Sequence, residues 1–245
     1  MPPFGPSPFG PDSDSRGPGS KATLTREFLL SGELEDMVRA TMPGVRVLSE
    51  AERAASLATV LDARPAGASL AVFGYGSLIW NPAIHVAGRR RVVAQGWHRS
   101  FCLLARGGRG TPESPGLMLG LTVGGTCEGV ALDLDPAAAP GELAILWRRE
   151  MVADGYIPRW VKLAAPAGGD AGWAIAFTIN PSGSSYAGDL NEATIVERLA
   201  TARGALGTAA EYLFNTIAGL AAIGVADPYL DAIAARLHAR LEQAG

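Results

Sequence analysis

The feature of this sequence that most constrains its fold is a series of short apolar segments lying between two regions of helical periodicity. Segments with strand character cover residues 70–73, 92–94, 100–104, 128–134, 159–163 and 174–179. Several of them alternate apolar and polar residues, and glycine-rich turns at 107–110, 124–125 and 168–169 separate them. Six short strands predict a closed or nearly closed sheet, because closure removes the unpaired strand edges.

Helical patterns flank these strands and interrupt them once. We expect helices between residues 24 and 64, a further helix at about 141–154, and more helices after residue 189. Signatures of helix N-termini occur at Ser49 with Glu52, Asp189 with Glu192, Thr208 with Glu211, and Asp227 with Pro228. Because helices and strands do not alternate regularly, this order favours an α+β fold over a parallel α/β fold.

The composition excludes several classes of protein. The chain is 48% hydrophobic and 18% charged, which is typical of globular proteins, and its net charge of −3 provides no overall basic surface for nucleic acid. Two cysteines are too few for a disulfide framework or a thiolate zinc site, and the three histidines lack metal-ligand spacing. We find no secretory signal and no long apolar segment, so we expect a cytoplasmic protein without a membrane contact.

Three regions are expected along the chain. Residues 1–22 are rich in proline, glycine and serine, and they contain too little apolar surface to offset the entropy of ordering. We therefore predict a disordered tail there. Residues 23–66 are predicted to form an N-terminal helical segment, and residues 67–245 are predicted to form the domain that contains the strands.

A glutamate occupies an apolar position of the helix expected at about 141–154. Leu143, Leu146, Trp147, Glu150 and Met151 share one face of that helix. Arg148 and Arg149 are expected to point away from this face. Glutamate is rarely buried without a partner, and burial raises its pKa. Glu150 is therefore either half of a structural ion pair, with Arg159 or Arg99 as its candidate partner, or a general base with a pKa tuned toward neutrality.

A second candidate site is the segment Phe73-Gly74-Tyr75-Gly76-Ser77-Leu78, which follows the first expected strand. Two glycines at a strand end allow the backbone to approach a ligand and to direct its N–H groups toward a carboxylate or an oxyanion. The alternative is an ordinary tight turn. The segment is neither a dinucleotide-binding fingerprint, because the third glycine is missing, nor a phosphate loop, because no Gly-Lys-Ser/Thr follows.

Several motifs together resemble the ChaC-like γ-glutamylcyclotransferases that act on glutathione. The motifs are VFGYGSLIW at 72–80, GWHR at 96–99, RGTPESPG at 109–116, REM at 149–151, GY at 155–156, EYLF at 211–214 and DPYL at 227–230. They come in the family's order and cover about residues 70–240. Two features depart from the pattern: the first 70 residues exceed a minimal member, and Thr208-Ala209 stands where many members have Pro-Asn.

The resemblance implies a small mixed β-barrel flanked by helices, a cytosolic protein and no cofactor or metal. It implies that Glu150 is the catalytic acid and base and that residues 67–245 are the catalytic domain. It assigns substrate binding to the loop residues Gly74, Tyr75, Gly76, Ser77, Leu78 and Ile79. Tyr186 aligns with a loop tyrosine near the family's site; it either packs against the barrel rim or hydrogen-bonds a ligand.

The activity implied by the resemblance is cleavage of glutathione to 5-oxoproline and Cys-Gly, with glutathione as the small-molecule partner and neither nucleic acid nor membrane involved. Two alternatives remain open at this stage. One is a cyclotransferase for other γ-glutamyl amines or dipeptides, which would share the fold and the base. The other is a non-catalytic binding module on the same barrel. The oligomeric state is left open by the sequence.

Overall fold

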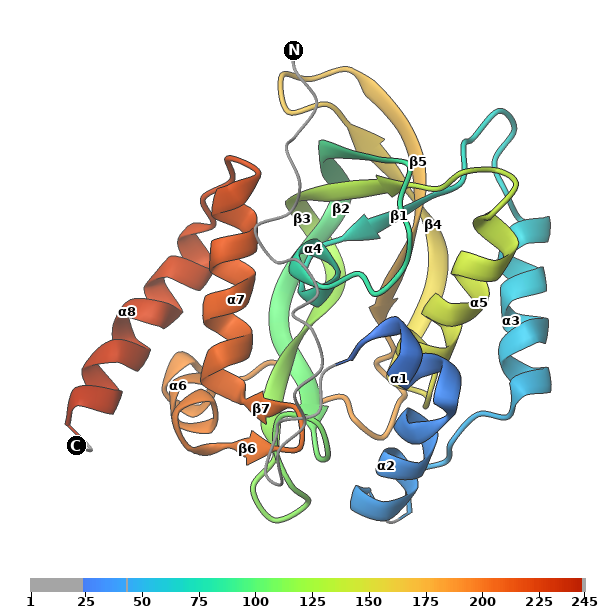
Figure 1. Ribbon diagram of the computed structural model, residues 1–245. Helices are drawn as coiled ribbons and strands as arrows, with labels where there is room; N and C mark the ends of the chain where they lie inside the picture. Colours follow the sequence, from blue (N-terminus) through green and yellow to red (C-terminus); the bar gives the residue numbers. More distant parts are fainter. Residues whose placement is uncertain (1–23, 43, 244–245) are drawn as a thin grey trace.

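Five strands form a closed barrel at the centre of the computed structural model, which describes residues 24–42 and 44–243 (Figure 1). The strands are β1 (Ala71–Gly74), β2 (Gly88–Ala105), β3 (Gly116–Asp133), β4 (Tyr156–Ala164) and β5 (Asp170–Ile179). Their order around the barrel is β1-β3-β2-β4-β5. The pairing of β1 with β5 is parallel and the other pairings are antiparallel, which confirms the predicted mixed barrel.

Two of the strands are much longer than predicted. Residues 92–94 and 100–104 belong to one strand, β2, which has 18 residues and a register shift between Gln95 and Trp97. The shift is a bulge that bends the strand without ending it. Strand β3 begins at Gly116 rather than near residue 128, and it pairs with β2 along its length. Glycines inside β2 and β3 hide this continuity, because they resemble turn residues in the sequence.

Helix α5 (Ala139–Glu150) lies against the barrel and carries Glu150 as its last residue. The ring of Trp147 contacts Phe177 of β5 edge to face, with 5.0 Å between centroids, and both side chains are almost fully buried. The Trp147 indole also donates to the hydroxyl of Ser56 in α3, at 3.2 Å. Contacts on both sides therefore fix α5 between the barrel and α3, and they hold its C-terminal end in place.

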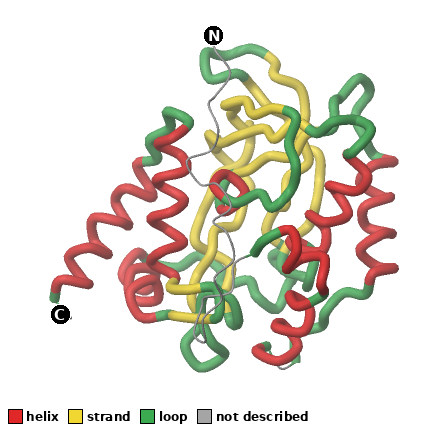
Figure 2. The backbone as a smooth tube through the Cα atoms, in the orientation of Figure 1, coloured by secondary structure: helices red, strands yellow, loops and turns green. Residues whose placement is uncertain are grey.

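Helices cover the barrel on two sides (Figure 2). On one side lie α6 (Glu192–Thr201), α7 (Ala209–Ala222) and α8 (Pro228–Glu242), with β6 (Arg203–Gly204) and β7 (Gly207–Thr208) beside them. Thr208 with Glu211 forms a capping box and Asp227 caps α8, as predicted. The predicted cap of α6 at Asp189 is wrong, because the side chain of Asn191 accepts the hydrogen bond from Thr194 N.

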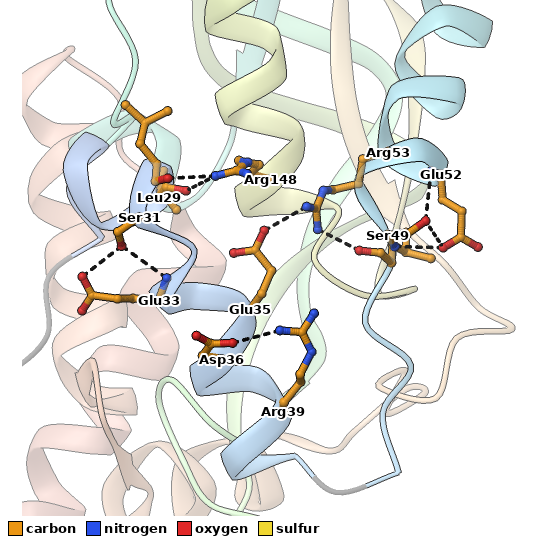
Figure 3. A network of polar contacts seen from close by, with 12 residues as sticks. Leu29, Ser31, Glu33, Glu35, Asp36, Arg39, Ser49, Glu52, Arg53 and Arg148 are labelled. Atoms are coloured by element: carbon orange, nitrogen blue, oxygen red, sulfur yellow. Dashed lines mark hydrogen bonds and ion pairs between the residues drawn. The ribbon is translucent and has the colours of Figure 1, made fainter.

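On the other side lie the helices that precede the barrel. They are α1 (Arg26–Ser31), α2 (Glu33–Thr41) and α3 (Glu50–Asp62). Of these, α1 and α3 pack against α5. Arg148 of α5 donates to the carbonyls of Leu29 and Leu30 at the end of α1 (Figure 3). The predicted disordered tail at residues 1–22 lies outside the described residues, and the division of the chain into domains stays a prediction. Among the residues that the structure describes, no helix is long and apolar enough to cross a membrane.

Candidate active site

The turn between β1 and the short helix α4 (Ser77–Trp80) offers free backbone donors. Tyr75 fixes this turn to the barrel, since its buried hydroxyl donates to the Phe177 carbonyl of β5 at 2.7 Å. The amides of Gly76, Ser77 and Leu78 donate no hydrogen bond to another described residue. The first amides of a helix have no acceptor within the helix. These groups are therefore available to a ligand.

The hydroxyl of Tyr212, from α7, lies directly over this turn. A Cβ atom placed on Gly76 would lie 2.7 Å from Tyr212 Oη, which is too close for any side chain. Tyr212 is buried, and its oxygen accepts a hydrogen bond from Leu119 N at 3.3 Å. Tyr156 Oη donates to the carbonyl of the same Leu119 at 3.2 Å. Strand β3 thus orients both tyrosines toward the turn.

Glu150 is largely buried beside the turn, and Arg149 connects the two. The side chain of Glu150 is 12% exposed, and its Oε1 lies 2.8 Å from Arg149 Nε. This contact is an ion pair without hydrogen-bond geometry, since Oε1 is buried and accepts no hydrogen bond from a described residue. Arg149 Nη2 donates to Ser77 Oγ at 2.8 Å, and Nη1 donates to the Asn81 carbonyl.

The ion-pair partner of Glu150 therefore differs from the prediction. Arg99 pairs instead with Asp227, at 3.1 Å, and the guanidinium of Arg159 lies 5.5 Å from the ring centroid of Trp97. Arg149 was expected to point away from the apolar face, yet its side chain is only 4% exposed. The reason is that α5 is covered by the barrel and also by α1 and α3, so a wider part of its surface is buried.

Burial sets the protonation of the site. Burial raises the pKa of Glu150 above that of an ordinary glutamate, and the positive charge of Arg149 offsets only part of this effect. The C-terminal end of α5 also carries partial negative charge, which disfavours a carboxylate there. Burial raises the pKa of Tyr212 to about 12 and that of Tyr156 well above its usual value. Both phenols therefore stay protonated near neutral pH.

A cavity brings these groups together. Its volume is about 170 Å³, and Ser77, Arg149, Glu150, Tyr156 and Tyr212 line it along with many apolar side chains. A smaller space of about 20 Å³ adjoins it, shares Ser77, Glu150 and both tyrosines, and is also lined by Tyr75, Gly76 and Leu78. The structure thus places most of the predicted loop beside Glu150.

Three of the predicted site residues do not reach either space. Gly74 and Ile79 line neither of them, and Ile79 packs against Gly219 of α7. Tyr186 is half-buried; it forms a β-bridge with Leu103 and packs near Cys102 at the barrel rim. Its neighbour Ser185 lines the cavity instead.

The roles of Arg149, Tyr156 and Tyr212 were not predicted. They lie in the motifs REM, GY and EYLF, respectively. The sequence motifs therefore include these residues, but they do not show which groups the residues contact. A buried tyrosine usually has a hydrogen-bond partner, which is a signal for a polar site inside a core. The partner itself, the backbone of Leu119, comes from a distant strand.

Residues 70–240 match the model of the ChaC-like protein family. The chain belongs to the ChaC-like family. It is 38% identical over 208 residues to the glutathione-specific γ-glutamylcyclotransferase of Escherichia coli, covering 85% of this chain and 89% of that protein. It is 30% identical over 179 residues to glutathione-specific γ-glutamylcyclotransferase 1 of Danio rerio, covering 71% of this chain and 91% of that protein.

The ChaC-like barrel also resembles a solved structure. The crystal structure of the yeast γ-glutamyl cyclotransferase specific to glutathione aligns with a TM-score of 0.64 at 20% sequence identity. The alignment covers 70% of this chain and 96% of that one. At this level of identity the likeness establishes the fold, and it agrees with the family match.

Proposed function

We propose that this ChaC-like protein is a γ-glutamylcyclotransferase that cleaves glutathione to 5-oxoproline and Cys-Gly. The observation that carries the proposal is a buried glutamate with a raised pKa, which shares one cavity with a turn of free backbone amides. The relatives from E. coli and D. rerio carry the name of this activity. The arrangement supplies a base and an oxyanion or carboxylate site, which are the two elements that the reaction needs.

The reaction is a ring closure within one molecule. The α-amine of the γ-glutamyl group attacks its own γ-carbonyl carbon, a C–N bond forms, and the amide bond to cysteine breaks. The products are 5-oxoproline and Cys-Gly, and neither water nor a second substrate is consumed. Holding two reacting groups in the right geometry lowers a barrier by about 7–11 kcal/mol, so the main task of the protein is to fold the substrate.

In our proposal Glu150 moves the protons. An α-amine has a pKa near 8, so it is mostly protonated at neutral pH and cannot attack. Ionised Glu150 accepts that proton and then donates it to the leaving nitrogen of cysteine. A glutamate with an ordinary pKa of about 4.3 is a weak base for this step, and each unit of upward shift contributes about 1.4 kcal/mol. The burial of Glu150 supplies a shift in the required direction.

We assign binding of the glutamyl group to the amides of Gly76, Ser77 and Leu78, which would hold its α-carboxylate or its γ-carbonyl oxygen. Support comes from the free N–H groups of the turn and from their place beside Glu150. We do not extend this assignment to Gly74, Ile79 and Tyr186, since these residues line neither cavity.

The test is incubation of the full-length protein with glutathione and, separately, with γ-glutamyl-alanine, followed by measurement of 5-oxoproline. We expect release from glutathione, with a much lower kcat/KM for γ-glutamyl-alanine. A preference for γ-glutamyl-alanine would identify a cyclotransferase for other γ-glutamyl substrates. Absence of 5-oxoproline from both would contradict the proposed activity and favour a binding module.

The acid limb of the pH profile should move when Arg149 is replaced. Only ionised Glu150 accepts a proton, so kcat/KM should rise as pH increases through the raised pKa of this residue. Arg149 lowers that pKa by its positive charge. In Arg149→Gln the midpoint of the acid limb should therefore shift to higher pH, and turnover should also fall because Ser77 loses its contact.

The control for this measurement is Arg148→Gln, on the same helix. Arg148 donates to backbone carbonyls of α1 and makes no contact with Glu150, so its loss should leave the midpoint unchanged. Each profile is scaled to its own maximum, which separates a change of pKa from a loss of folded protein. An unchanged midpoint in Arg149→Gln, or a shift to lower pH, would contradict the role of Glu150 as the titrating base.

A further inference from the structure

The N-terminal helices supply one wall of the cavity that contains Glu150. The wall residues are Leu24, Leu34, Met37, Val38 and Met42. All of them precede residue 70, where the match to the ChaC-like family begins. They form an apolar surface across the cavity, and two of them are methionines, whose flexible thioethers adapt to the shape of a bound group.

Buried polar contacts fix α2 in this position. Glu35 of α2 and Arg53 of α3 form an ion pair at 2.9 Å, and both side chains are less than one-tenth exposed (Figure 3). Arg53 also donates to the Leu48 carbonyl at 2.8 Å. Leu48 N in turn donates to the carbonyl of Val152, just beyond Glu150, at 3.0 Å. The wall is therefore connected to the same chain segment that carries the proposed base.

The end of α2 rests directly on the loop that follows β2. A Cβ atom placed on Gly107 would lie 2.5 Å from Thr41 Oγ1 and 3.3 Å from Met42 Cγ. A larger residue at position 107 would force the end of α2 to move, so Gly107 is compatible with α2 in this position. The contact brings Met42 next to the part of the cavity lined by Arg106 and Gly107.

Arg106 contributes a positive charge to the cavity, and no described carboxylate lies within ion-pair distance of it. Its Nη1 donates to the Ser184 carbonyl at 3.1 Å and to Ser185 Oγ at 3.4 Å, and it forms no ion pair with a described residue. The other charged groups that line the cavity, Arg149 and Glu150, form a pair with each other. An unpaired guanidinium beside an apolar surface is suited to a ligand with a carboxylate at one end.

We propose that this part of the cavity is a subsite for the leaving dipeptide, in which Arg106 binds the terminal carboxylate and Met37, Val38 and Met42 contact the side chain. The inference rests on the proposed function and names the residues that select its substrate. The wall accommodates a small uncharged side chain such as the cysteine thiol. It disfavours a charged one, which would be buried against apolar groups without a partner.

The first test compares Arg106→Gln with the wild type on two substrates, glutathione and the ethyl ester of its glycine carboxylate. Loss of one charged hydrogen bond at a half-buried site should raise KM for glutathione about tenfold. The value of kcat should change little, because the carboxylate lies away from the reacting atoms. The wild type should show a similar rise in KM with the ester, and Arg106→Gln should show no further rise with the ester.

The outcomes separate this inference from the proposed function. If the wild type cleaves glutathione but Arg106→Gln has an unchanged KM, or loses affinity equally for the acid and the ester, the subsite is wrong and the proposed function stands. If the wild type releases no 5-oxoproline from glutathione, the proposed function fails, and this inference fails with it.

The second test examines the wall itself by placing a charge in it. Met37→Glu directs a carboxylate into the cavity, where it would face the substrate, and should raise KM for glutathione by at least about tenfold. The matched control is Ala40→Glu, which puts the same side chain on the exposed face of α2. Circular dichroism and thermal melting verify that both variants fold. Equal KM values for two folded variants would contradict a substrate-facing role for α2.

Discussion

Glu150→Gln is expected to abolish formation of 5-oxoproline while the protein still folds and binds glutathione. Glutamine has nearly the same shape, but it neither accepts the proton of the substrate amine nor donates one to the leaving nitrogen. General acid–base catalysis contributes about 100- to 10,000-fold per group, and Glu150 is assigned both steps, so a loss of at least about 1,000-fold in kcat is expected. The measurement is 5-oxoproline release at saturating glutathione, with binding followed by calorimetry.

Glu142→Gln is the matched control, because it makes the same chemical change on the same helix. Glu142 pairs with Arg26 at 2.5 Å and does not line the cavity, so this variant should keep its activity. Near-normal turnover in Glu150→Gln would show that another group is the base. Loss of activity in both variants would point to damage to α5 rather than to loss of the base.

Glu150→Gln also carries a prediction about stability, and the direction of the change in stability follows from proton linkage. The folded-state pKa of Glu150 is raised, so at a pH between the unfolded and folded values the folded state holds the proton more tightly. The contribution of Glu150 to stability therefore falls as pH rises above the unfolded value. Glutamine avoids this penalty, and the melting temperature of Glu150→Gln at neutral pH should equal or exceed that of the wild type.

Gly76→Ala is expected to lower kcat/KM about 100-fold, because the turn that faces Glu150 must move. The added Cβ would lie 2.7 Å from Tyr212 Oη, and Tyr212 is buried and tied to Leu119. A displacement of about 1 Å in a site that orients its substrate reduces the rate by about that factor. Steady-state kinetics with glutathione measure the loss.

The cause of that loss can be checked by a second substitution. In the double variant Gly76→Ala with Tyr212→Phe, the oxygen that clashes is absent, so part of the activity should return. The control is Gly141→Ala on α5, where a Cβ meets no atom within 4 Å, and its activity should be normal. If Gly76→Ala alone were fully active, or if the double variant were worse than either single variant, the close approach would not explain the need for glycine.

Helical spacing was sufficient to predict that Glu150 lies on the apolar face of its helix, because Leu143, Leu146 and Trp147 define that face, and its side chain is largely buried. The same reasoning failed for Arg149. A single amphipathic face assumes that one side of a helix meets solvent, whereas α5 lies between the barrel and two other helices. The partner of the glutamate was therefore its own neighbour, which the sequence pattern had assigned to the solvent side.

The barrel was predicted from its strands, but the lengths of two strands were not. Gly96 and Gly120 interrupt the apolar pattern of β2 and β3, although the backbone continues through both positions. The wall formed by α2 could not be predicted, because no local pattern at Thr41 or Met42 indicates contact with Gly107. Such contacts depend on how distant elements pack, and a single sequence does not specify them locally.

The cavity draws its lining from both ends of the chain, from Leu24 to Tyr212, and this has a consequence for synthesis on the ribosome. A nascent chain releases its first helices early, but the barrel closes only when β5 pairs with β1. The cavity is complete only after α7 has emerged. Until then the cavity lacks Tyr212 and stays open on the side of α7, so chains that stall before α7 would be inactive toward glutathione and would expose apolar surface that chaperones bind.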